Sequence, residues 1–142
     1  MSYTIRKPQE IVLKQDFFGK ELTIKSGIFA PNCDWAVRIK LGGTEVLVTA
    51  VMKRYPNPDK DFLPLTIDFR DSNHAVGKIG GWAYRKREGR PTEMVTLNGR
   101  IVDRTLRPMF PKGMINDIVI SVTPLSFDKG SKYSFRAFVL FK

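Results

Sequence analysis

Alternating apolar and polar residues predict a β-hairpin in the first half of the chain. In residues 35–41 (WAVRIKL) apolar side chains occupy every second position, and Arg38 and Lys40 fall on the opposite face. Gly42 and Gly43 follow directly, and residues 45–52 (EVLVTAVM) are apolar on both faces. Glycine tolerates the positive φ angles of tight hairpin turns. We therefore expect two strands joined at Gly-Gly, with the second strand in the interior of a sheet.

Three further segments have the features of strands. Residues 22–27 alternate weakly, residues 62–69 place four apolar side chains on one face, and residues 115–122 are strongly apolar. Pro64 indicates a strand that is not fully paired on one side, and the proline-rich residues 53–61 predict a loop. Residues 129–142 also alternate but are unusually aromatic, and their structure stays open.

The period changes from two to about 3.6 after Gly89. Pro91 suits the first turn of a helix and Thr92 suits its cap. The apolar positions of this helix are Met94, Leu97, Ile101 and Val102, whereas Arg100, Arg104 and Arg107 line one face. Gly99 weakens the helix slightly, and Pro108 and Pro111 end it. Strands followed by a helix and a further strand predict an α+β domain with a mixed sheet.

Composition excludes several classes of protein. The 142 residues are 42% hydrophobic and 27% charged, which is typical of a single globular domain. Apolar runs are too short to span a bilayer, and no secretory leader opens the chain, so we expect a cytoplasmic protein without a membrane partner. One cysteine, Cys33, and one histidine, His74, argue against disulfides, a Cys-based zinc site and a Ser-His hydrolase.

The excess of positive charge indicates a polyanionic partner. The formal net charge is +10 and the pI is near 9.9. Half of this charge lies in residues 78–107, which hold eight basic and three acidic side chains.

The most informative stretch is residues 77–91, GKIGGWAYRKREGRP. Trp82 and Tyr84 offer flat faces on which bases can stack, and Arg85, Lys86 and Arg87 follow as phosphate ligands. A protein that binds single-stranded nucleic acid without regard to sequence needs this combination of stacking and phosphate contacts. The alternative is a solvated basic loop whose aromatic residues anchor the core. The arginine face of the helix has two similar interpretations: it contacts phosphates, or it pairs with Glu93 or Asp103. Pairing is favoured for Arg104 and Arg107, which lie close to Asp103 and to the helix end.

Other catalytic signals are weak. Residues 77–81 lack the closing Lys-Ser/Thr of a nucleotide-binding loop. Asp59, Asp61, Asp68 and Asp71 are spaced so that they could bind Mg²⁺, although surface solvation is the simpler interpretation. Trp35, at the start of a strand, is expected in the core.

Several strings resemble a known family. They are DFLPLTI at 61–67, AVGKI at 75–79, REGRP at 87–91, and GRIVDR through RPMFP at 99–111. In this order and at this spacing, over roughly residues 6–125, they are similar to the amino-terminal RNase PH-like domain of bacterial polynucleotide phosphorylase. The resemblance implies an α+β, RNase PH-like (ribosomal protein S5 domain 2-like) fold with packed helices. It also implies that residues 1–142 form one domain, the first RNase PH-like domain, which is incomplete at its carboxyl end.

The resemblance also implies an activity. The family degrades RNA, including mRNA, from 3′ to 5′ with inorganic phosphate, forms trimers with a central channel, and uses Mg²⁺ bound in a second RNase PH-like domain. The first domain contributes an aromatic and arginine loop to the channel, here residues 82–87. We therefore expect single-stranded RNA as partner, no catalytic or metal-binding residue, and no cofactor bound by this chain alone. The expected RNA-binding residues are Trp82, Tyr84, Arg85, Lys86, Arg87, Arg90 and Arg100.

Departures from the family pattern leave a second function open. Ala83 separates the two aromatic residues, residues 128–142 diverge, and the second catalytic domain is missing. The sequence thus predicts the RNA-binding half of a phosphorolytic exoribonuclease, inactive by itself. The alternative is a non-catalytic RNA-binding or assembly module.

Overall fold

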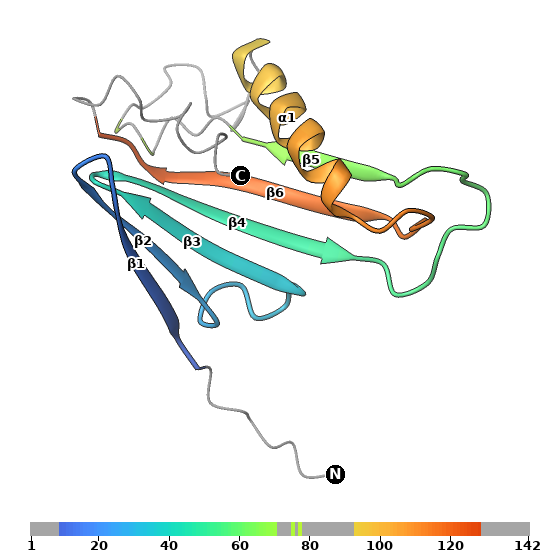
Figure 1. Ribbon diagram of the computed structural model, residues 1–142, viewed down its shortest axis with the longest axis horizontal. Coiled ribbons are helices and arrows are strands. Elements are labelled where there is room, and N and C mark those ends of the chain that lie inside the picture. The colour runs from blue at the N-terminus through green and yellow to red at the C-terminus, as the bar shows by residue number, and fades with distance from the viewer. Residues whose placement is uncertain (1–8, 71–74, 76, 78–92, 129–142) are drawn as a thin grey trace.

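The computed structural model describes residues 9–70, 75, 77 and 93–128. In this part of the chain six strands form one mixed sheet in the order β1-β2-β3-β4-β6-β5, and one helix, α1, packs on it (Figure 1). The strands are β1 (Ile11–Phe17), β2 (Lys20–Ser26), β3 (Trp35–Leu41), β4 (Thr44–Met52), β5 (Leu65–Phe69) and β6 (Ile118–Ser126). Helix α1 spans Glu93–Leu106 and continues as the short 3₁₀ helix η2 (Arg107–Met109). The predicted α+β class is confirmed.

Strands β1 to β4 form an antiparallel meander, with two-residue turns between β1 and β2 and between β3 and β4 and a longer connection, residues 27–34, between β2 and β3. Phe18 and Gly19 have φ angles of 51° and 73° between β1 and β2, as a two-residue hairpin turn of matching twist requires. The predicted Gly-Gly hairpin is confirmed: Leu41 pairs with Thr44, and Gly42 has a φ of 59°.

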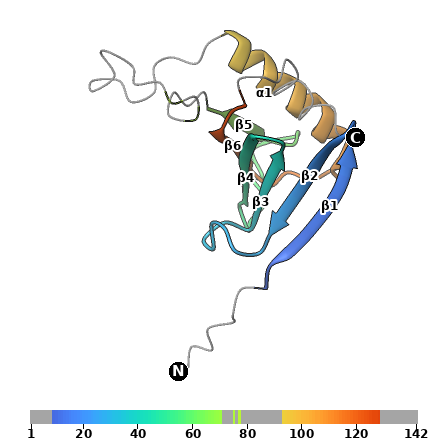
Figure 2. The ribbon, with the colours of Figure 1, turned by 90° about the vertical axis from the view of Figure 1, so that its left-hand side faces the viewer.

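Strand β6 lies between β4 and β5, antiparallel to the first and parallel to the second. The connection from β5 to β6 runs through α1, which lies on the concave side of the curved sheet (Figure 2). Pro124 is buried within β6, opposite Val46. The register shifts between Glu45 and Val46, and a proline without an N–H is tolerated at such an irregularity.

The core lies where β4 and β6 meet the helix. Val46, Ile118, Ile120 and Val122 are buried there, and Leu106 packs against them. Strand β4 is interior, as its two apolar faces predict, and β5 is an edge strand, as Pro64 indicates. The strand predicted from residue 62 begins only at Leu65, and the one predicted from residue 115 begins at Ile118.

One expectation about a buried residue is wrong. Trp35 is 57% exposed because it lies on the concave face beyond the reach of α1. Of the four apolar helix positions named from the sequence, Val102 faces the sheet, beside Val95 and Leu106. The other three, Met94, Leu97 and Ile101, are exposed. Strand β1 is not among the predicted strands, because Ile11, Val12 and Leu13 form an apolar run rather than an alternation.

Candidate nucleic-acid interface

Most of the interface predicted from the sequence lies outside the described residues, and the structure describes mainly the strands and the helix next to it. Six of the seven expected RNA-binding residues lie outside the described residues, and so do His74, Asp71 and residues 129–142. The six are Trp82, Tyr84, Arg85, Lys86, Arg87 and Arg90. Arg100 is described and lies on α1.

The segment that holds these residues begins and ends at one end of the sheet. Strands β5 and β6 are parallel, so their carboxyl ends lie at the same edge. There the Arg70 N–H donates to the Val122 carbonyl at 3.1 Å, and the Phe127 N–H donates to the Ala75 carbonyl at 3.0 Å. The β3–β4 hairpin joins them, because the Asp128 N–H donates to the hydroxyl of buried Thr44 at 3.3 Å. Helix α1 starts at this end as well (Figure 1).

Packing of α1 against β5 fixes the direction in which Arg100 projects. Gly99 faces β5, and a Cβ at this position would lie 3.9 Å from the Ile67 carbonyl oxygen and from Phe69 Cβ. Arg100, the next residue, is rotated by about 100° around the helix axis and is exposed. Its guanidinium therefore projects from the flank of α1, just past the middle of the helix.

The arginine face of α1 is not a uniform binding surface. Arg107 lies in η2, and its Nη2 contacts Asp103 Oδ1 at 2.8 Å while its Nη1 donates to the Leu63 carbonyl at 2.9 Å. The prediction that Arg107 pairs with Asp103 is therefore confirmed. Arg104 is exposed and makes no ion pair with another described residue. Arg100 and Arg104 are thus the helix residues that can reach phosphate.

Arg70 is a basic residue of this end that was not predicted. It follows β5 directly, its side chain is 50% exposed, and its Nε lies 2.9 Å from Asp68 Oδ2. One sequence signal could have identified Arg70: it directly follows a predicted strand, and the basic residues 78–92 come soon after it.

The acidic residues do not assemble into a metal site within the described part of the chain. No group of three or more His, Cys, Asp or Glu side chains lies close enough there to hold an ion. Asp68 pairs with Arg70, and Asp59 and Asp61 are exposed. These donors do not fit Mg²⁺, and no step of magnesium chemistry is assigned to them.

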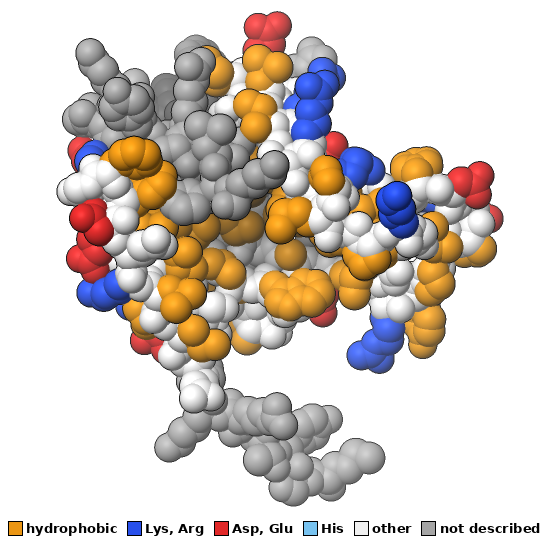
Figure 3. Space-filling view, in the orientation of Figure 1, with side chains coloured by type: hydrophobic (Ala, Val, Ile, Leu, Met, Phe, Trp, Pro, Cys, Tyr) orange, Lys and Arg blue, Asp and Glu red, His pale blue; other side chains and the backbone are white. Residues whose placement is uncertain are grey.

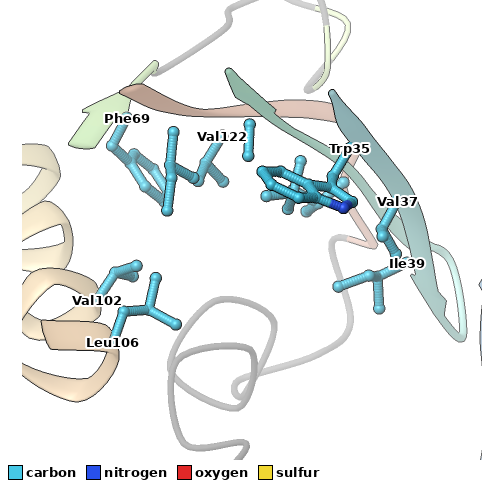
Figure 4. A pocket seen from close by; sticks show the side chains of 11 residues that line it. Trp35, Val37, Ile39, Phe69, Val102, Leu106 and Val122 are labelled. Atoms are coloured by element: carbon cyan, nitrogen blue, oxygen red, sulfur yellow. The ribbon is translucent and has the colours of Figure 1, made fainter. Parts of the chain in front are cut away.

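An apolar hollow of about 300 Å³ opens between α1 and the concave face of the sheet. Trp35, Val37 and Ile39 line one side, and Phe69, Val102 and Leu106 line the other (Figure 4). Hydrophobic side chains also gather around it in the space-filling view (Figure 3). A hollow with this lining suits apolar side chains rather than phosphates or bases.

Comparison with known proteins shows the family. Residues 19–137 match the model of the 3′ exoribonuclease family, domain 1, so the chain belongs to the RNase PH family. No described helix is long and apolar enough to cross a membrane.

The most similar relatives include enzymes named polyribonucleotide nucleotidyltransferase. That of Sulfurihydrogenibium azorense is 46% identical over 120 residues, which are 84% of this chain and 17% of the relative. Those of Roseiflexus castenholzii and Heliobacterium modesticaldum are each 44% identical, over 82% and 83% of this chain and 15% and 16% of the relative. The chain thus spans about a sixth of the length of the relatives it matches.

Proposed function

We propose that this domain is the RNA-binding half of a phosphate-dependent 3′-to-5′ exoribonuclease that acts in mRNA degradation, and that it is inactive by itself. The observation that carries the proposal is the position of Arg70 directly after β5, where the chain leads into the basic residues 78–92, together with exposed Arg100 on α1, the helix that follows them. Family membership and the name of the relatives support the same chemistry. In the full-length enzyme, phosphate is the attacking group, and we propose Mg²⁺ as cofactor and a homotrimer as the assembly.

The arginines would contribute by binding the phosphodiester backbone. Guanidinium groups remain charged at all physiological pH values and donate hydrogen bonds in a planar fork that matches phosphate. Backbone contacts hold RNA without regard to sequence, which suits an enzyme that advances along any strand. Trp82 and Tyr84 would add stacking on successive bases.

Salt dependence tests the binding step. Arg100→Ala, and separately Arg85→Ala with Lys86→Ala, should weaken binding of a fluorescent single-stranded oligonucleotide. Each lost phosphate contact should flatten the plot of log affinity against log salt by about 0.7. Tyr84→Ala should lower affinity by about 1–3 kcal/mol with the slope nearly unchanged.

Lys112→Ala is the matched control. Lys112 is exposed and lies between η2 and the start of β6, whereas Arg70 follows the carboxyl end of β5. Equal slopes for the parent and every variant would contradict the interface.

Phosphorolysis tests the catalytic part of the proposal. With poly(A), phosphate and Mg²⁺, the isolated chain should release no ADP above background. The same chain fused to the remainder of the Sulfurihydrogenibium azorense relative should release ADP. ADP release by the isolated chain would contradict inactivity.

The fusion also separates the second candidate, a non-catalytic RNA-binding or assembly module. The exposed stripe of Met94, Leu97 and Ile101 on α1 favours that candidate, because uncovered apolar side chains at helical spacing suit a protein partner. A folded fusion that binds RNA without releasing ADP would support it.

A further inference from the structure

A cluster of cations lies on the convex face of the sheet, which α1 does not cover. Ile39 of β3 lines the hollow beneath α1, and Ile24 of β2 is its partner in register. Because side chains alternate along a strand, the residues on either side of these two isoleucines point to the convex face. They surround another hollow, of about 150 Å³. The residues that line it are Thr23, Lys25, Arg38, Lys40 and Glu45.

The three cations of this hollow are close neighbours in the sheet. Lys25 is directly opposite Arg38 in the pairing of β2 with β3, and Lys40 is the diagonal neighbour of Lys25. Opposed residues of an antiparallel pair have Cβ atoms about 4.5–5.5 Å apart, and like charges at this spacing are destabilising. An anion bound between the cations would remove the repulsion.

Arg38 is held in place by contacts within the chain. Its guanidinium carbon lies 5.0 Å from the centroid of the Phe29 ring, and its Nε contacts Glu45 Oε1. A guanidinium has further N–H donors on its two Nη atoms, so Glu45 does not exhaust its capacity to bind. A side chain that is already restricted loses less conformational entropy when it binds a ligand.

The hollow carries a net positive charge. Three cations and one carboxylate line it, which gives +2. Of the carboxylates nearby, Glu21 is paired with Lys14 at 2.7 Å, and Glu10 contacts Lys25 Nζ at 3.0 Å in an exposed ion pair. Such a pair is weak, so Lys25 can turn to a bound anion. Lys40 makes no ion pair with another residue that the structure describes.

We propose that Lys25, Arg38 and Lys40 bind a phosphate group on the convex face of the sheet. A planar guanidinium flanked by two ammonium groups matches the shape and the negative charge of this ligand. Two sources offer the group: inorganic phosphate and a phosphodiester of an RNA strand. Only the second source rests on the proposed RNA-binding function. The sheet separates this site from α1, which lies on the concave side (Figure 2).

Inorganic phosphate tests the site without RNA. The thermal midpoint of the full chain should rise with phosphate concentration at constant ionic strength, because a ligand that binds the folded state stabilises it. Lys40→Gln should weaken the affinity for phosphate by about tenfold or more. It should leave the midpoint without phosphate unchanged, since Lys40 has no ion pair to lose. The matched control is Lys112→Gln, which removes the charge of another exposed lysine and should respond as the parent does.

Lys25→Gln is a second variant that separates binding from folding. The repulsion from Arg38 and the exposed ion pair with Glu10 disappear together, so the midpoint without phosphate should change little. The affinity for phosphate should again fall by about tenfold. A purely structural role for Lys25 would leave the phosphate response unchanged.

A fluorescent single-stranded RNA identifies the source of the phosphate group. If the site takes a phosphodiester, Lys40→Gln should flatten the plot of log affinity against log salt by about 0.7. An unchanged slope with a weakened phosphate response would assign the site to inorganic phosphate.

The variants at the predicted loop keep this test separate from that of the proposed function. Arg85→Ala with Lys86→Ala should retain the full phosphate response, whatever its effect on RNA binding. The proposal is overturned if neither the phosphate response nor the salt slope differs between the parent and the Lys25→Gln and Lys40→Gln variants. Equal losses for Lys112→Gln would overturn it as well.

Discussion

Gly27 shows how a single missing side chain holds the start of the described chain in place. Its φ is 97°, and a Cβ at this position would overlap the carbonyl oxygen of Gln9. The residue therefore has two independent requirements for glycine: a left-handed backbone and close contact with another segment.

Gly27→Ala should destabilise the fold by roughly 2–3 kcal/mol, and Gly19→Ala by only about 1 kcal/mol. Gly19 has a similar φ of 73° but nothing within 4 Å of its Cβ position, so it isolates the backbone cost. Urea unfolding of the two variants measures the difference. Equal losses of stability would show that contact with Gln9 has no effect.

Asp117 joins two segments by accepting from two lysines. Its carboxylate oxygens lie 2.7 Å from Lys53 Nζ and 3.1 Å from Lys60 Nζ, and these hydrogen bonds hold the pKa of Asp117 below its ordinary value of 3.8. Because the folded state holds this proton less tightly than the unfolded state, the contribution to stability is complete above pH 3.8 and is lost as the pH falls through the lowered pKa.

Asp117→Asn should therefore unfold with a shallower dependence on pH below 3.8 than the parent does. The measurement is the urea midpoint across an acid pH series, with exposed Asp59→Asn as the control. Parallel curves for the parent and Asp117→Asn would contradict the assignment.

Helix α1 illustrates what pattern could and could not predict at the scale of the element. Its existence and its approximate end follow from the 3.6-residue period and from Pro108. The face that it buries does not follow from the pattern, because the helix has two apolar stripes. One stripe consists of Met94, Leu97 and Ile101, and the other of Val95, Val102 and Leu106. Only the position of β5 decides between them, and it favours the stripe that contains Gly99.

Gly99→Ala should stabilise the protein. The new methyl group would make ordinary van der Waals contact with Ile67 and Phe69, and alanine gains about 0.8–1 kcal/mol over glycine within a helix. The thermal midpoint should rise by a few degrees. Gly99→Leu is the matched comparison and should lower it, since the larger side chain would push α1 away from β5. A lower midpoint for Gly99→Ala would show that the contact with β5 is tighter than described.

Some strands can be predicted from local sequence alone, and others depend on residues far away in the chain. The hairpin at Gly42-Gly43 was predictable because its signal is contained in about twenty residues. Strand β1 was not, since it lies at an edge and needs little alternation to be stable there. The exposure of Trp35 also depends on distant residues, because it reflects how far α1 reaches across the sheet.

For the whole molecule, the family and the fold class follow from motifs, and the basic interface stays a prediction; the full set of contacts made by Arg107 does not follow from motifs. Arg107 is bound to Asp103 and to the Leu63 carbonyl, a contact between residues 44 positions apart. The pairing with Asp103, four residues earlier, is readable from the sequence, whereas the contact with the Leu63 carbonyl depends on how the chain folds.

The strand order has a consequence for the growing chain on the ribosome. Strands β1 to β4 can form their meander as soon as Met52 emerges, but β6, the partner of β4, begins only at Ile118. At 5–20 residues per second, synthesis of residues 53–117 takes roughly 3–13 s. Throughout that interval the most apolar strand of the sheet is an open edge, and β5 has no strand with which to pair. The nascent chain is therefore most exposed to misassociation, and most in need of a chaperone, between the fourth strand and the sixth.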